Sequence, residues 1–200
     1  MSSTKSLREE DLQNACRVAF SAGYNGVKLY FMMGLPTETD EDLLGISSIA
    51  RNVLHNFREN ASNRARGVRI SVGVSTFVPK AQTPFQWCGQ IDRQEIVRRQ
   101  QVLMDSLKIK NVTYSLHGWQ ASFLEAVLAR GGRVCTVIEG AWRRGSRLDG
   151  WDECFDLNRW LDAFEECGAD PAFYANRELG ENEITPWDHI FSRYQAVSAQ

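Results

Sequence analysis

The chain has 200 residues, of which 43% are hydrophobic and 24% charged, and its formal net charge is −2. This composition can bury one sizeable core, or one core with a small helical annex, and it excludes a largely disordered chain. The weak acidic balance gives no field that would hold nucleic acid or an anionic membrane in bulk, and no apolar stretch approaches a membrane span, so we expect a cytoplasmic protein without membrane contact.

Two patterns open the chain. Residues 8 to 22 predict a helix, because apolar side chains recur at helical spacing, acidic residues fill the first turn and Gly23 follows. Residues 27 to 33 form an almost unbroken apolar run that ends at Gly34. Such a run is typical of a strand buried on both faces, which belongs to a parallel sheet.

A capped helix and a second strand come next. Thr39 followed by Asp42 fits a capping box, which predicts a helix running to about Phe57. Residues 68 to 78 then alternate between aliphatic and small or polar side chains, which predicts a strand with two different faces. The face with small or polar residues comprises Ser71, Gly73 and Ser75. It is equally consistent with a side that faces a ligand or barrel lumen and with an ordinary solvent-exposed side.

The remaining elements indicate a change of architecture. Asp92 with Glu95 forms another capping box and predicts a helix to about Lys110, and residues 112 to 116 read as a short third strand. Helices are predicted after residue 118, at residues 119–130, 134–145 and 154–167. We therefore expect one domain over residues 1–118 and a helical subdomain over residues 119–200.

The strand pattern favours an incomplete sheet. Strands separated by helices imply right-handed crossovers and a parallel α/β sheet. Three strands are few for such a sheet. In addition, the predicted helix before the first strand has no strand before it. We expect a missing N-terminal portion to be the natural partner of this chain. The alternative is a compact three-stranded domain that pairs with another protein.

Ligands of parallel α/β proteins bind at the carboxyl ends of the strands. Here those ends lead into KLYFMMGLPTETDEDL, residues 28–43, and STFVPKAQTPFQW, residues 75–87. Gly34 in the first segment would let the backbone approach a flat ligand. The second is a proline-punctuated loop with two aromatic residues, which suggests a lid.

In this order and spacing, the two segments resemble the fifth-strand and sixth-strand segments of the radical S-adenosylmethionine (radical SAM) core. The phrases LEAVLARGGR, AWRRGSRLDGW, WLDAFEECGADPAFYA and PWDHI resemble the helical tail of one uncharacterised branch of that superfamily. The resemblance covers about residues 8 to 190. It implies the last βα units of a parallel (β/α) partial barrel followed by the small helical subdomain.

The resemblance also implies cofactors and a site. The intact protein would use S-adenosylmethionine and a [4Fe–4S] cluster to form a 5′-deoxyadenosyl radical that abstracts hydrogen from an unknown substrate. The residues implied to line the adenosylmethionine pocket are Met32, Met33, Gly34, Thr76, Phe77 and Val78.

The cysteines depart from the superfamily pattern. Its CxxxCxxC cluster motif is absent, because the five cysteines are scattered along the chain. The Gly-Gly-Glu segment that holds the methionine amino group is also absent, and both lie upstream in the superfamily. We therefore expect this chain to contribute pocket wall and lid, to bind neither cofactor stably alone, and to be inactive alone.

Other classes of function have weaker signals. The alternative function is a non-catalytic interaction module that docks on a protein or RNA partner through the exposed sheet edge or through a basic patch on the tail. The patch comprises Arg130, Arg133, Arg143, Arg144 and Arg147. A metal site would need His117 with Cys135, Cys154 and Cys167, which lack paired spacing. An acid–base enzyme would use His189 with the acidic residues Asp149, Asp152, Glu153 and Asp156. The tryptophans at 142, 151, 160 and 187 are expected to form the tail's small core, or else a carbohydrate or base platform.

Overall fold

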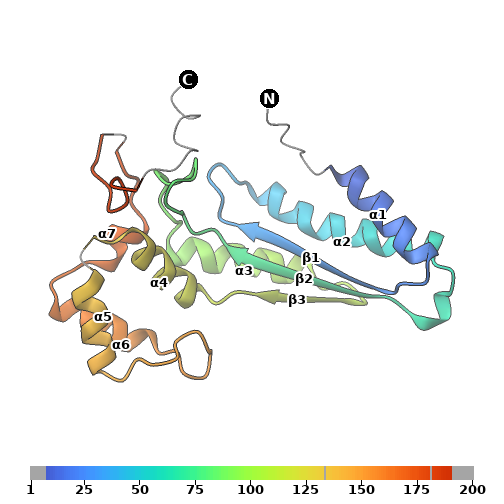
Figure 1. Cartoon of the computed structure of the whole chain (residues 1–200). Helices are drawn as coiled ribbons and strands as arrows, with labels where there is room; N and C mark the ends of the chain where they lie inside the picture. The colour runs from blue at the N-terminus through green and yellow to red at the C-terminus, as the bar shows by residue number, and fades with distance from the viewer. Residues whose placement is uncertain (1–7, 133, 181, 191–200) are drawn as a thin grey trace. The chain divides into compact units, whose positions relative to one another are not determined.

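The computed structural model describes residues 8–132, 134–180 and 182–190. The chain forms two compact units (Figure 1). Among the described residues, the first unit comprises residues 8–75 and 97–117, and the second comprises those of residues 76–96 and 118–190. The domain boundary predicted at residue 118 stays a prediction. In the structure, residues 76–96 pack with the helical tail.

The elements include those that the sequence predicts, in the same order, and two short ones that it did not predict. The amino-terminal part contains α1 (Glu9–Ser21), β1 (Gly26–Met33), α2 (Asp40–Asn60), a 3-10 turn η1 (Arg64–Arg66), β2 (Arg69–Thr76), α3 (Arg93–Ser106) and β3 (Val112–Leu116). The tail contains α4 (Trp119–Arg130), α5 (Val134–Arg143), α6 (Leu157–Glu166) and α7 (Pro171–Ala175). The two that were not predicted are η1 and α7. The α/β class with a parallel sheet is confirmed.

The sheet has the strand order β1-β2-β3. β2 and β3 are parallel, with Ile70 opposite Val112 and Val74 opposite Leu116. The alternation predicted for β2 is confirmed: Ile70, Val72 and Val74 are at most 2% exposed, whereas its small residues are half-buried on the other face.

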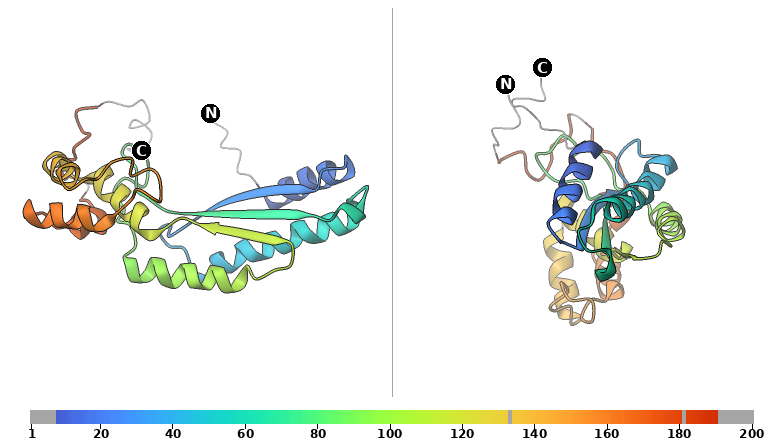
Figure 2. Two further views of the ribbon diagram at one scale, coloured as in Figure 1. Left: turned by 90° about the horizontal axis from the view of Figure 1, so that it is seen from below. Right: turned by 90° about the vertical axis from the view of Figure 1, so that its right-hand side faces the viewer.

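Helices cover one face of this sheet. Figure 2 shows α2 and α3 along the same side of the strands. α1 packs on α2 through the rings of Phe20 and Phe57, whose centroids are 5.2 Å apart, and Asn56 of α2 donates to the Gln13 carbonyl. The core between helices and sheet includes Leu43, Val53, Ile70 and Leu103, none of them exposed.

The prediction that β1 is buried on both faces is wrong. Leu29 and Met33 are buried toward the helices, but Tyr30 is 79% exposed and Met32 is 45% exposed. The reason is that β1 lies at an edge of the sheet, and the described residues of this unit place helices on one face only. An apolar strand is therefore left with one uncovered face.

Capping interactions fix where the helices begin. The Thr39 side chain accepts from the Asp42 N–H, and the Asp42 carboxylate accepts from the Thr39 N–H, as the capping box predicts. Asp92 accepts from the N–H of Glu95 at 2.8 Å. Both predicted starts are within one residue of the observed ones.

The second unit has its own hydrophobic core. Its fully buried members are Ala126, Val127, Ala141, Ala163 and Ala175. Trp160 and Trp187 are buried as predicted, but the prediction is wrong for Trp142 and Trp151, which are 56% and 63% exposed. Within the described ranges, no helix is both long and apolar enough to cross a membrane.

Candidate functional site

The turn after β1 has an unusual backbone. Gly34 has φ 85° and Thr37 has φ 66°, both in the left-handed region that glycine tolerates best. The Gly34 N–H donates to Oε2 of Glu38 at 2.7 Å. A carboxylate four residues along the chain therefore holds the first peptide after the strand.

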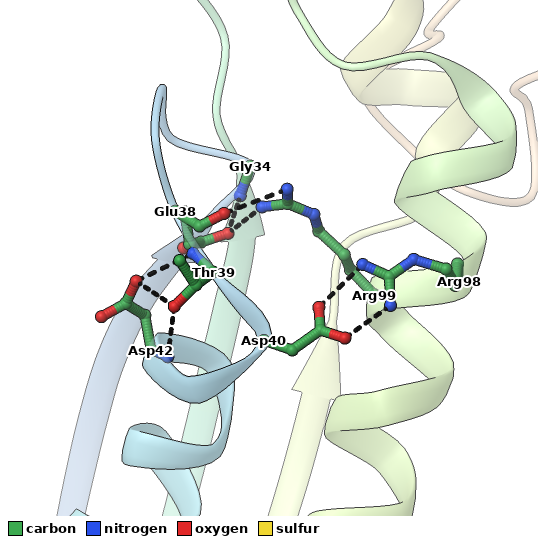
Figure 3. A network of polar contacts seen from close by, with 7 residues as sticks. All are labelled: Gly34, Glu38, Thr39, Asp40, Asp42, Arg98 and Arg99. Carbon is green, nitrogen blue, oxygen red and sulfur yellow. Dashed lines mark hydrogen bonds and ion pairs between the residues drawn. The ribbon is translucent and has the colours of Figure 1, made fainter.

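Glu38 is also held by an arginine from α3 (Figure 3). Arg99 Nη1 lies 2.5 Å from Glu38 Oε2, and Arg99 Nη2 donates to the Glu38 carbonyl oxygen. The two side chains are only 11% and 8% exposed. The neighbouring pair, Arg98 with Asp40, is bidentate but about half-exposed.

This network positions the backbone at the carboxyl end of β1. Since Arg99 already compensates the Glu38 carboxylate, the pair is better suited to fixing the turn than to exchanging protons. Neither Glu38 nor Arg99 was predicted as a site residue. The signal available was an acidic side chain in the turn, but no local pattern indicates which of many arginines lies opposite it.

A second candidate region is the uncovered face of the sheet, which we call the open face. It carries Lys28, Tyr30 and Met32 from β1, Ser71, Gly73 and Ser75 from β2, and Thr113, Ser115 and His117 from β3 and its end. Residues of all three strands line a hollow of about 570 Å³ on this face.

Contacts within the open face are specific. The Tyr30 ring lies on Gly73, because a β-carbon at Gly73 would be 3.2 Å from Tyr30 Cδ1. The hydroxyls of Ser71 and Thr113 are 3.2 Å apart, and Ser75 donates to the Phe31 carbonyl. A side chain at Gly73 would have to displace the Tyr30 ring by a few tenths of an ångström, so glycine favours this close approach.

The first three predicted cofactor residues lie at the end of β1 and differ in what they can offer. Met32 exposes its side chain on the open face, whereas Met33 is 1% exposed and belongs to the core. The Gly34 N–H is already bonded to Glu38. Met32 is therefore the side chain of this group that a ligand could touch.

The other three residues lie in the second unit and are buried. Phe77 is 5% exposed and its carbonyl accepts from Gln90 Nε2, while Val78 joins the hydrophobic core. The Thr76 hydroxyl is buried without a hydrogen-bond partner. A ligand would meet backbone or this hydroxyl here. The pocket predicted to be shared by the two segments stays a prediction.

The proline-punctuated loop of the second unit is fastened by the carboxyl-terminal segment. Gln90 N–H donates to the Ala175 carbonyl, and Leu179 N–H donates to the Trp87 carbonyl. Trp187 Nε1 donates to Gln86 Oε1 at 2.8 Å. The tail therefore fixes the conformation of this loop.

The cysteines do not gather. Cys16 is buried in α1, where desolvation raises its thiol pKa, while Cys135 and Cys167 are exposed. Among the residues that the structure describes, no three His, Cys, Asp or Glu side chains come together as a metal site. These residues do not fit a [4Fe–4S] cluster, which cysteine thiolates hold from one place.

The arginines predicted as a basic patch have separate partners. Arg130 is 4% exposed and donates to the carbonyls of Tyr174, Ala175 and Arg177, so it does not belong to a surface patch. Arg143 pairs with Glu139, Arg144 pairs with Glu166, and Arg147 stacks over Trp142. Arg133 lies outside the described residues.

The acidic residues of the tail have structural contacts. Asp149 accepts from Trp160 Nε1 at 2.9 Å, and Asp156 caps α6 by accepting from the Asn158 N–H. Asp152 and Glu153 lie in the turns before α6 and are exposed. The acid–base role considered for this group with His189 stays a prediction.

Fold and site together define an α/β protein with a small parallel sheet that has one open face. The loop after β2 is held by hydrogen bonds to the carboxyl-terminal segment. The chain is 27% identical to the uncharacterized protein MJ0966 of Methanocaldococcus jannaschii over 167 residues, which make up 82% of the chain. It spans about a third of that relative's length, 34%. No protein-family profile matches the chain, and no experimentally determined structure matches it.

Proposed function

We propose that this chain is the carboxyl-terminal βα portion of a radical SAM barrel, which supplies pocket wall and lid to an enzyme of unknown substrate. The observation that carries the proposal is the open face. A three-stranded sheet covered by helices on one side, with small polar residues and Tyr30 on the other, has the two-sided character of a barrel wall.

The edge of the sheet supports the same proposal. β1 is eight residues long and carries five large apolar side chains, yet it lies at an edge. Long apolar edge strands invite pairing with another strand, and isolated proteins usually protect them. An upstream strand in a longer polypeptide would pair with β1, and the relative in Methanocaldococcus jannaschii is about three times the length of the matched segment.

In this proposal the cofactor groups divide between two parts of the enzyme. The cluster thiolates would come from sequence outside this chain, since the described cysteines do not gather. When bound at the cluster, adenosylmethionine supplies a carbon radical for hydrogen abstraction. This chain would contribute Met32 to the pocket, and the Glu38–Arg99 pair would fix the backbone beside it.

The test is reconstitution with the missing portion. The chain is co-produced anaerobically, with iron and sulfide, with the polypeptide encoded upstream that carries CxxxCxxC. We expect a stable complex with visible iron–sulfur absorbance that forms 5′-deoxyadenosine from adenosylmethionine under reducing conditions. The chain alone should do neither.

A matched pair of variants locates the contribution of this chain. Met32→Lys places a charge on the wall that would face the cofactor, and we expect less 5′-deoxyadenosine. Val18→Lys adds the same charge to an exposed site on α1, 66% accessible, and should leave the yield unchanged. Absence of any upstream cysteine motif, with a stable monomeric chain, would overturn the proposal.

The same edge supports a second candidate, a non-catalytic module that docks on a protein partner. Strand addition to β1 would give affinity through backbone hydrogen bonds without requiring a cofactor. In that case the chain should form a complex with a partner that lacks the cysteine motif, and the complex should contain no iron. Docking through the Arg-rich tail has less support, because Arg130 is buried.

A further inference from the structure

The open face has a charge bias that the whole chain lacks. The sequence contains 25 Asp and Glu residues against 23 Lys and Arg residues. Among the described residues that line the hollow, none is acidic, whereas Lys28 and His117 lie there. Arg69, two residues before Ser71 on β2, shares this face by strand alternation and is also exposed.

The hydroxyl groups on the same face differ in whether their protons are engaged. The Thr113 hydroxyl donates to the Ile70 carbonyl and lies 3.2 Å from the Ser71 hydroxyl, so this pair is already engaged, whereas Ser115 is exposed beside Gly73 in the next row. A hydroxyl donor on the same face as a lysine suits the oxygens of a carboxylate or phosphate, because hydrogen bonds to an ionised acceptor are roughly twice as strong as neutral ones.

The middle of the face is apolar. The Tyr30 ring contacts Gly73, yet the residue is 79% exposed, so its ring is accessible for stacking. The hollow of about 570 Å³ is within the range of small-molecule sites, roughly 300 to 1,000 Å³. Its size therefore fits a small molecule better than a macromolecular surface.

We infer that the open face binds the substrate, and that this substrate is an anion with a planar ring, its carboxylate or phosphate held near Lys28 and its ring stacked on Tyr30. This inference rests on the proposed function, since it names the substrate class of the same barrel interior. It concerns residues of the first unit alone and needs no bound cofactor to be tested.

The experiment uses the 200-residue chain and follows nuclear magnetic resonance shifts of the Tyr30 ring and of the Ser71, Gly73 and Ser115 amides. Phenylphosphate, benzoate and benzylamine are the probes, because they share a ring and differ in charge. We expect both anions to shift these resonances and benzylamine to shift them far less. Tighter binding of phenylphosphate or of benzoate identifies the anion as phosphate or carboxylate.

Two variants and a control assign the effect to the open face. Lys28→Gln should weaken anion binding about three- to fivefold, as expected for one exposed charge pair. Ser115→Asp should abolish anion binding and favour benzylamine. Ser48→Asp adds the same charge to an exposed position on α2 and should change nothing.

Several outcomes would overturn the inference. They are equal binding of benzylamine, no shift with any probe, or an unchanged affinity in Lys28→Gln. Displacement of phenylphosphate by S-adenosylhomocysteine would assign the face to the cofactor and overturn its assignment to substrate. None of these results depends on an iron–sulfur cluster, so failure here and failure of the reconstitution are separate findings.

Discussion

A β-carbon at Gly89 would lie 2.1 Å from the carbonyl oxygen of Asn176 and 2.7 Å from its carbonyl carbon. Real β-carbons do not approach backbone so closely, so the loop and the tail segment can lie together only because residue 89 has no side chain. Asn176 strengthens the contact by donating to the carbonyls of Gln90 and Ile91. The loop after β2 and the carboxyl-terminal segment are therefore one structural element.

Gly89→Ala should destabilise the second unit by about 1 to 3 kcal/mol, the usual cost of inserting a methyl group where the backbone must move. Urea unfolding followed by tryptophan fluorescence measures the change. Gly150→Ala is the matched control, because a β-carbon there meets nothing within 4 Å. Equal stability of the two variants would show that the loop and tail separate easily.

Arg99→Ala should destabilise the first unit by about 3 to 5 kcal/mol, because it leaves the Glu38 carboxylate buried without its cation. Arg98→Ala, at the next residue, removes a half-exposed pair with Asp40 and should cost no more than about 1 kcal/mol. Chemical denaturation of both variants measures the contrast. Similar losses would mean that Glu38 finds another partner or water.

Thr39→Ala should cost about 1 kcal/mol, since it removes the side-chain acceptor for the Asp42 N–H at the start of α2. Thr39→Ser keeps the hydroxyl and should restore most of that stability. Thermal unfolding monitored by circular dichroism distinguishes the two. An alanine variant as stable as the serine variant would show that the cap contributes little.

Stability of the second unit should fall in acid through Glu183. Hydrogen bonds from Arg177 lower the pKa of Glu183 from 4.5 to about 2. Because the folded-state pKa lies below the unfolded one, the contribution is complete above about pH 4.5 and is lost as the pH falls toward 2. Unfolding measured across that range should show a smaller pH dependence in Glu183→Gln. An identical slope in both proteins would contradict the assignment.

Local sequence determined much of this fold. The two-residue alternation at β2, the capping box at Thr39 and the span of β3 were all predicted from neighbours along the chain, and the structure confirms them. Such patterns are readable because each depends on the period of a strand or on a hydrogen bond across one helical turn. The resemblance to the radical SAM core stays a prediction.

Only the tertiary structure decided which surfaces and pairs exist. The apolar sequence of β1 does not indicate which of its two faces the helices will cover. The exposure of Tyr30 and Met32 is therefore decided by packing. Glu38 and Arg99 are 61 residues apart, and no local period connects them. Likewise, Trp142 and Trp160 have the same side chain, and the packing of α5 and α6 leaves one exposed and buries the other. Burial and long-range pairing depend on which residues become neighbours in space. Local patterns along the sequence do not show this for residues far apart in the chain.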